Sequence, residues 1–166
     1  LGAAGHFGMG YDLSRGMDIY TAYSVGSGDT NSGDDIHQTF DNLYASNHGN
    51  YGAMDMFSLQ NLHNFELVMT LEKDQLTIRG AAQAFSLYNA EDDGWYGIKM
   101  NAVRGGAEGA DPYVGSELDV SIRFTPHPGT FIEAGSSAFL PGAYIAATGE
   151  NTDVATFGYV VTSMSF

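Results

Sequence analysis

Residues 116–125 read SELDVSIRFT, and their side chains alternate between polar and apolar along the stretch. Leu118, Val120, Ile122 and Phe124 share one parity, while charged or small polar residues occupy the other. Successive side chains of a β-strand point to opposite faces of its sheet, so a period of two residues indicates a strand. This stretch therefore predicts a strand with one apolar face and one polar face.

The same alternation recurs elsewhere in the chain. HFGMGYDL at 6–13 and FELVMTLE at 65–72 keep it clearly, and QLTIRGAAQA at 75–84 keeps it more weakly. Other segments, rich in Val, Ile, Tyr, Phe and Thr, have high β-propensity with irregular parity. Together these patterns predict seven strands, near residues 4–13, 17–26, 61–72, 75–87, 116–125, 129–137 and 154–166.

The connections between the predicted strands alternate between short and long. LSRG, EKD and PHPG are tight turns, whereas the connections 27–60, 88–115 and 138–153 are longer. Outer-membrane barrels have this asymmetry, with short periplasmic turns and long extracellular loops. The pattern therefore predicts an all-β fold, an antiparallel transmembrane β-barrel, with residues 1–166 as a single barrel segment.

The composition excludes several classes of protein. Asp and Glu number 20 against 6 Lys and Arg, and this net charge of −14 is unsuited to binding phosphate backbones, so we expect no nucleic-acid partner. The absence of cysteine excludes disulfides and thiolate metal sites.

No apolar run approaches the roughly 18 residues of a transmembrane helix, and the mean hydropathy of −0.14 is compatible with a membrane barrel. The first residues, LGAAGHF, lack an initiator Met and a signal-peptide pattern, so we expect the chain to be cut from a longer protein.

Charged residues on the polar parity are predicted to face the lumen. There they would either set ion selectivity or form inward-facing ion pairs that stiffen the wall, and both interpretations stay open. Counting outward from PHPG places Arg123 opposite Glu133, and counting from EKD places Arg79 near Glu66. The candidate lining residues are Asp18, Glu66, Glu72, Arg79, Glu117, Asp119, Arg123 and Glu133.

The chain offers few candidates for metal binding or catalysis. Asp29, Asn31, Asp34 and Asp35 supply oxygen ligands that suit calcium, but they lack EF-hand spacing, and Asx turns in a solvated loop are the favoured interpretation. The histidines have no metal-ligand spacing, and no G-x-S-x-G motif is present. We therefore expect neither enzymatic activity nor a cofactor. Two aromatic residues that follow an acidic stretch, Trp95 and Tyr96, are expected either to anchor the protein at the outer headgroup level or to stack on sugar rings.

FDNLYASNHGNYGAMD at 40–55, followed by SLQNLHNFEL at 58–67, resembles the alginate-export-type outer-membrane porins. DDGWY at 92–96 and the segment 115–142 resemble the same family in the same order. The residues that carry the loop resemblance are Phe40, Asp41, Leu43, Tyr44, Asn47, His48, Tyr51, Gly52 and Asp55.

The resemblance implies a wide barrel of roughly 18 strands, of which this chain would be the C-terminal portion, completed by the remaining strands of the same barrel. It implies passage of a hydrophilic solute or polysaccharide across the outer membrane of a Gram-negative bacterium. The implied partners are outer-membrane lipid and the barrel-assembly machinery. That machinery would read a terminal aromatic residue, here Phe166. The best-known cargo of the family is an anionic polysaccharide, which should need a lumen that offers cations. The acidity of this chain departs from that expectation. The competing interpretation is a soluble, secreted β-sandwich that binds carbohydrate.

Overall fold

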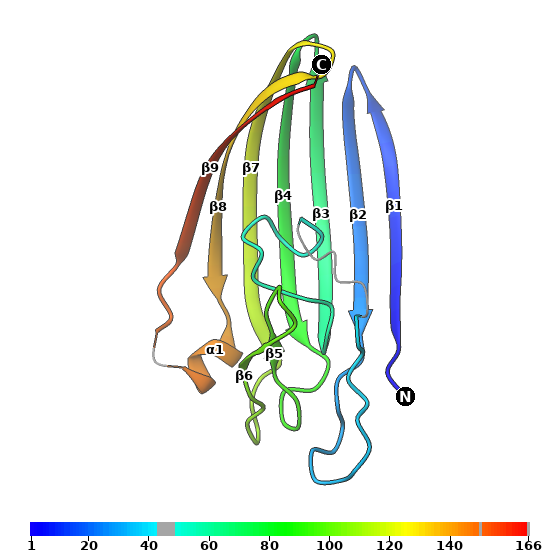
Figure 1. Cartoon of the computed structure of the whole chain (residues 1–166), viewed down its shortest axis with the longest axis vertical. Coiled ribbons are helices and arrows are strands. Elements are labelled where there is room, and N and C mark those ends of the chain that lie inside the picture. The colour runs from blue at the N-terminus through cyan, green and yellow to red at the C-terminus, as the bar shows by residue number, and fades with distance from the viewer. Residues whose placement is uncertain (43–48, 150, 166) are drawn as a thin grey trace.

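Seven long strands form one antiparallel sheet in the order β1-β2-β3-β4-β7-β8-β9 (Figure 1). The computed structural model describes residues 1–42, 49–149 and 151–165. The predicted all-β antiparallel sheet and its seven strands are confirmed to within a few residues, although the sheet does not close into a barrel. The long strands are β1 (Ala4–Ser14), β2 (Met17–Gly26), β3 (Leu62–Lys73), β4 (Leu76–Leu87), β7 (Tyr113–His127), β8 (Thr130–Pro141) and β9 (Ala155–Met164).

Three short elements that the sequence patterns did not predict lie in the long connections. The two-residue strand β5 (Trp95–Tyr96) pairs with β6 (Ala102–Arg104). The helix α1 (Ala143–Thr148) follows β8. Within the described ranges, no helix has the length and apolar character needed to cross a membrane.

All tight turns lie at one end of the sheet and all long connections at the other (Figure 1). Between β1 and β2, Arg15 and Gly16 both have positive φ, 58° and 74°, as a type I′ hairpin turn requires. Between β7 and β8, Gly129 follows Pro128 with a φ of 81°, as in a type II turn. The predicted alternation of short and long connections is therefore present in the structure.

One face of the sheet, here called the outer face, is apolar and uncovered. On β7, Leu118, Val120, Ile122 and Phe124 point to it and remain 41–51 % exposed. They span roughly 20 Å along the strand, close to the height of the apolar band of an outer-membrane barrel. A β-sandwich would bury this face under a second sheet. Among the described residues no second sheet lies on it, so the structure gives the sandwich interpretation no support.

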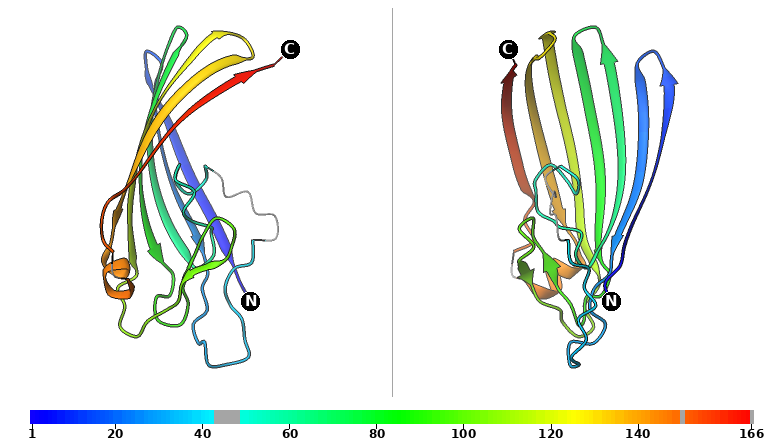
Figure 2. Two further views of the ribbon diagram at one scale, coloured as in Figure 1. Left: turned by 60° about the vertical axis from the view of Figure 1, so that its left-hand side comes forward. Right: turned by 45° about the vertical axis from the view of Figure 1, so that its right-hand side comes forward.

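The buried apolar core lies on the opposite, inner face, at the end with the long connections. Phe57 from the β2–β3 connection stacks on Phe85 of β4, with ring centroids 3.9 Å apart. Trp95 also stacks on Phe57, with ring centroids 5.2 Å apart, and the ring of Phe139 of β8 is tilted against Phe57 at 5.9 Å. Figure 2 shows the connections gathered on this concave side of the curved sheet. The core thus holds the long connections against the sheet.

Candidate functional site

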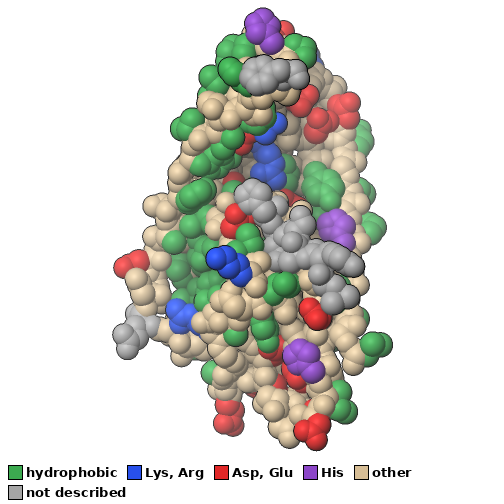
Figure 3. All heavy atoms as spheres, viewed as in Figure 1, with side chains coloured by type: hydrophobic (Ala, Val, Ile, Leu, Met, Phe, Trp, Pro, Cys, Tyr) green, Lys and Arg blue, Asp and Glu red, His purple; other side chains and the backbone are tan. Residues whose placement is uncertain are grey.

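The inner face carries the charged residues predicted to line a lumen. Strand pairing aligns Glu66, Gln83 and Glu117 in one row across β3, β4 and β7. Figure 3 looks onto this face, where acidic and basic side chains lie in the hollow between the strands. The register places all the candidates on it: Asp18, Glu66, Glu72, Arg79, Glu117, Asp119, Arg123 and Glu133.

Arg123 and Glu133 form the tightest ion pair of this face. They lie directly opposite each other on β7 and β8, and Arg123 Nε donates to Glu133 Oε2 over 2.6 Å. The hydroxyl of Tyr159 donates to Glu133 Oε1 over 2.7 Å. The guanidinium also lies over the ring of Phe131, 4.3 Å from its centroid. The pairing that was counted across the PHPG turn is confirmed.

The second arginine of this face is also paired. Arg79 Nη2 lies 3.4 Å from Glu66 Oε1. The contact is diagonal, because Arg79 is opposite Thr70 and Glu66 is opposite Gln83 in the register. The predicted proximity is confirmed, and both arginines of the long strands on the inner face therefore have an acidic partner. Whether these residues line a channel stays a prediction.

Part of the β2–β3 connection, residues 49–58, folds over the inner face and is called the infolded loop below (Figure 2). The backbone N–H of Met54 donates to Glu117 Oε1 over 2.9 Å. Gly52, at φ 90°, comes so close that a Cβ there would lie 2.5 Å from Glu117 Oε2. Glu117 is fully buried by this contact. The loop is thus fixed directly on the wall of the sheet.

The base of the infolded loop is fixed by the neighbouring connection. The indole Nε1 of Trp95 donates to the carbonyl of Met56 over 3.1 Å. The backbone N–H of Ser58 donates to the carbonyl of Tyr96, also over 3.1 Å. These bonds add to the stacking of Phe57 and make the infolded loop part of a rigid assembly.

Asp93 joins the two longest connections. Its Oδ2 accepts hydrogen bonds from the backbone N–H of Asp29 at 2.8 Å and from the Thr39 hydroxyl at 2.5 Å. Its Oδ1 accepts the Tyr96 hydroxyl at 2.8 Å. Burial, followed by this bond to Asp93, raises the pKa of Tyr96 to about 12. The network therefore depends on a neutral Tyr96.

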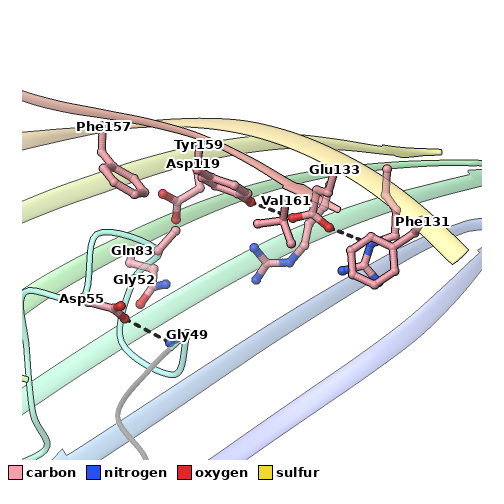
Figure 4. A pocket seen from close by; sticks show the side chains of 13 residues that line it. Gly49, Gly52, Asp55, Gln83, Asp119, Phe131, Glu133, Phe157, Tyr159 and Val161 are labelled. Atoms are coloured by element: carbon pink, nitrogen blue, oxygen red, sulfur yellow. Dashed lines mark hydrogen bonds and ion pairs between the residues drawn. The ribbon is translucent and has the colours of Figure 1, made fainter. Parts of the chain in front are cut away.

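Two pockets flank the tip of the infolded loop. A pocket of about 410 Å³ lies toward β8 and β9. Figure 4 shows Glu133 and Phe131 toward one end of it and Asp119 with Gln83 toward the other, with Tyr159 between them. A pocket of about 650 Å³ lies toward β1–β3 and includes His6, Tyr20, Tyr51 and Glu66 among its lining residues. Aromatic rings beside charged and amide groups can hold a hydrophilic solute by stacking and hydrogen bonds.

The sequence patterns missed several residues of this site. Tyr159, which holds Glu133, lies opposite Gly135, where a Cβ would lie 2.4 Å from the phenol ring. Tyr20 likewise lies over Gly8. A glycine within a strand is a sign of such a close approach, and it was the available signal.

The residues of the loop resemblance lie in different places. Tyr51, Gly52 and Asp55 belong to the infolded loop, where Asp55 Oδ1 accepts the backbone N–H of Gly49 over 3.3 Å. Phe40 and its neighbour Asp41 belong to the first half of the β2–β3 connection. The backbone N–H of Phe40 donates to the carbonyl of Ser27. The predicted residues outside the described ranges are Leu43, Tyr44, Asn47, His48 and Phe166.

The prediction that Trp95 anchors the protein in the membrane interface is wrong. Trp95 is 6 % exposed and packs against Phe57 on the inner side of the sheet, so its ring meets neither lipid nor a sugar. Tyr96, half-buried beside it, is bound to Asp93. The error arises because an aromatic residue in a long connection can turn inward as easily as outward.

A different aromatic group lies on the outer face at the end with the long connections. The Tyr23 hydroxyl and His63 Nδ1 are 2.6 Å apart. The His63 ring stacks on Tyr88, and Tyr23 packs against Phe65 at 4.6 Å. Amphipathic rings at the border of an apolar band are typical of the aromatic girdle of a barrel.

Asx turns shape the acidic stretch 28–35. Asp29, Asn31 and Asp34 each accept a hydrogen bond from the backbone N–H two residues further along, as Asx turns do. In the part of the chain that the structure describes, no group of three or more His, Cys, Asp or Glu side chains could hold a metal ion, and calcium binding by these residues and Asp35 stays a prediction.

Comparison with known families agrees with this architecture. The family model for alginate export matches residues 7–158, which is most of the chain. The chain belongs to the alginate export family. This is a family of outer-membrane transport proteins rather than of enzymes, and the two-faced antiparallel sheet is compatible with it. No curated protein matches the chain.

Proposed function

We propose that this member of the alginate export family forms part of the wall of an outer-membrane channel that passes hydrophilic solutes or polysaccharide. The observation that carries the proposal is the contrast between the two faces of the sheet. Leu118 and Val120 are half exposed on the outer face, whereas Glu117 and Asp119 point inward from the same strand. An exposed apolar face opposite a charged face suits a wall between lipid and water.

In this proposal residues 1–166 form one barrel segment, and further strands pair with the edges β1 and β9 to close the barrel. The tight turns would face the periplasm and the long connections the exterior. Phe166 would then end at the periplasmic side, where the assembly machinery reads it.

The infolded loop would narrow the channel from within. The contact between Met54 and Glu117 and the stacking of Phe57 on Phe85 hold it against the wall. The two pockets beside it would be the openings through which solute passes.

Three measurements on the full-length protein test the proposal. We expect it to stay in the membrane fraction in high salt, to run differently on gels before and after heating, and to conduct ions in planar bilayers. Release by salt without detergent, together with unchanged gel mobility, would show that the protein is not a membrane barrel.

A further inference from the structure

Two acidic side chains lie side by side beneath the infolded loop. Glu117 and Asp119 lie two residues apart on the inner face of β7, so their side chains point to the same side of the sheet. Glu117 Oε1 binds the N–H of Met54. Glu117 Oε2 and both carboxylate oxygens of Asp119 are buried and make no hydrogen bond within the described ranges. Two buried carboxyl groups so near each other on one strand favour a shared proton or a bound cation.

A fourth oxygen atom without a partner belongs to the residue paired with Asp119 on the neighbouring strand. Ser137 of β8 is directly opposite Asp119 and 3 % exposed. Its Oγ is buried and has no hydrogen-bond partner among the residues that the structure describes. Carboxylate and hydroxyl oxygens together form a donor set that suits hard cations. The unpaired hydroxyl of Ser137 is independent of the acidic pair and indicates that a ligand binds beside it.

The arginines of the inner face do not neutralise this site. Arg79 pairs with Glu66 and Arg123 pairs with Glu133. Asp119 lines the pocket of about 410 Å³ beside the infolded loop, so its charge acts on ions in that pocket even though its carboxylate oxygens are buried. The described residues hold no cluster of three acidic or histidine ligands. The donor set therefore suits a mobile cation better than a resident metal ion.

We propose that Glu117, Asp119 and Ser137 form a cation-binding site at the constriction and make the channel conduct small cations in preference to anions. The inference rests on the proposed channel function. Carboxylates beside a narrow aqueous path raise the local concentration of cations and repel anions.

The test is the permeability ratio of K⁺ to Cl⁻ for the full-length protein in planar bilayers under a KCl gradient. We expect the wild type to prefer K⁺. The double variant Glu117→Gln, Asp119→Asn removes the charge and keeps the shape, and it should lower the ratio by roughly fivefold. Glu108→Gln, an exposed position on the β6–β7 connection, is the matched control and should leave the ratio unchanged.

Folding of each variant is checked by its heat-dependent gel mobility. If the double variant does not fold, Asp119→Asn alone retains the acceptor for Met54 and should still lower the ratio. An unchanged ratio, as a proton shared by the pair would give, overturns the inference, and so does a wild type that prefers Cl⁻. A full-length protein that inserts but does not conduct at all would instead overturn the channel function, and the inference with it.

Discussion

The backbone N–H of Met54 donates to Oε1 of Glu117 over 2.9 Å, and this bond joins the longest connection to the wall of the sheet. Glu117 is fully buried there, with Gly52 against its other oxygen. A hydrogen bond to a charged group contributes about 1.5–3 kcal/mol, and leaving such a group without a partner costs more than that. The loop position therefore depends on this contact, and variants at and around it should change the channel.

Gly52→Ala should move the infolded loop away from Glu117 and raise the single-channel conductance, because the new Cβ would lie 2.5 Å from the carboxylate. Gly49→Ala is the matched control. Gly49 has a φ of 70° and Gly52 a φ of 90°, so both are in the left-handed region. A Cβ added at Gly49 would have no other atom within 4 Å. Both substitutions cost about 1–2 kcal/mol, because a residue with a Cβ is strained in the left-handed backbone conformation. The two variants therefore differ only in the contact of the new Cβ with Glu117. Equal conductance in the two variants would contradict the constriction.

Phe57→Ala should detach the base of the infolded loop. Phe57 is completely buried between Phe85 and Trp95, and truncation of such a residue costs about 3–5 kcal/mol. Phe65→Ala is the control, since Phe65 is 60 % exposed on the outer face. Limited proteolysis in detergent should cleave the loop faster in the first variant only. Equal cleavage of both would argue against the core that we describe.

Neutralising Arg79 and Arg123 together should shift the reversal potential of the full-length channel toward cation preference. Each arginine is 40–46 % exposed, but its glutamate partner is only 14 % exposed, so loss of the cation leaves a largely buried carboxylate and destabilises the fold. A folded variant with an unchanged reversal potential would show that these residues only stiffen the wall.

Single cysteines at Val120 and Ser121 should distinguish the two faces of β7. The chain has no cysteine of its own to interfere. Val120 is half exposed on the outer face, whereas Ser121 is on the inner face opposite Arg79. In native membranes a charged, water-soluble thiol reagent should label position 121 and leave position 120 unmodified. The reverse pattern would mean that the faces are exchanged.

The connection that contains Tyr96 should loosen at alkaline pH. The pKa of Tyr96 is raised from 10.0 to about 12, so the folded protein holds this proton more tightly than the unfolded one. The contribution of protonated Tyr96 to the stability of the folded protein is complete below pH 10 and is lost as the pH rises to about 12. Proteolysis of this connection should accelerate across that interval. Tyr96→Phe has no proton to lose there and should show a flatter profile.

The ion pairs of the inner face could be predicted because they are nearly local. Arg123 and Glu133 lie on strands joined by one tight turn, and counting outward from the turn gives their register. The same counting brought Arg79 close to Glu66. Trp95 was misplaced because its environment is built by Phe57 and Phe139, which belong to other parts of the chain.

Local sequence patterns are enough to predict the seven strands, the two faces of the sheet and the separation of tight turns from long connections. These features follow from the two-residue period of a strand and from turn residues such as Gly16 and Gly129, which act locally. No local pattern predicts that the stretch around Gly52 and Met54 folds inward onto Glu117, which is seen only in the three-dimensional fold. The bond between Met54 and Glu117 spans 63 residues, and burial of a carboxylate beneath a loop leaves no periodic trace in either segment.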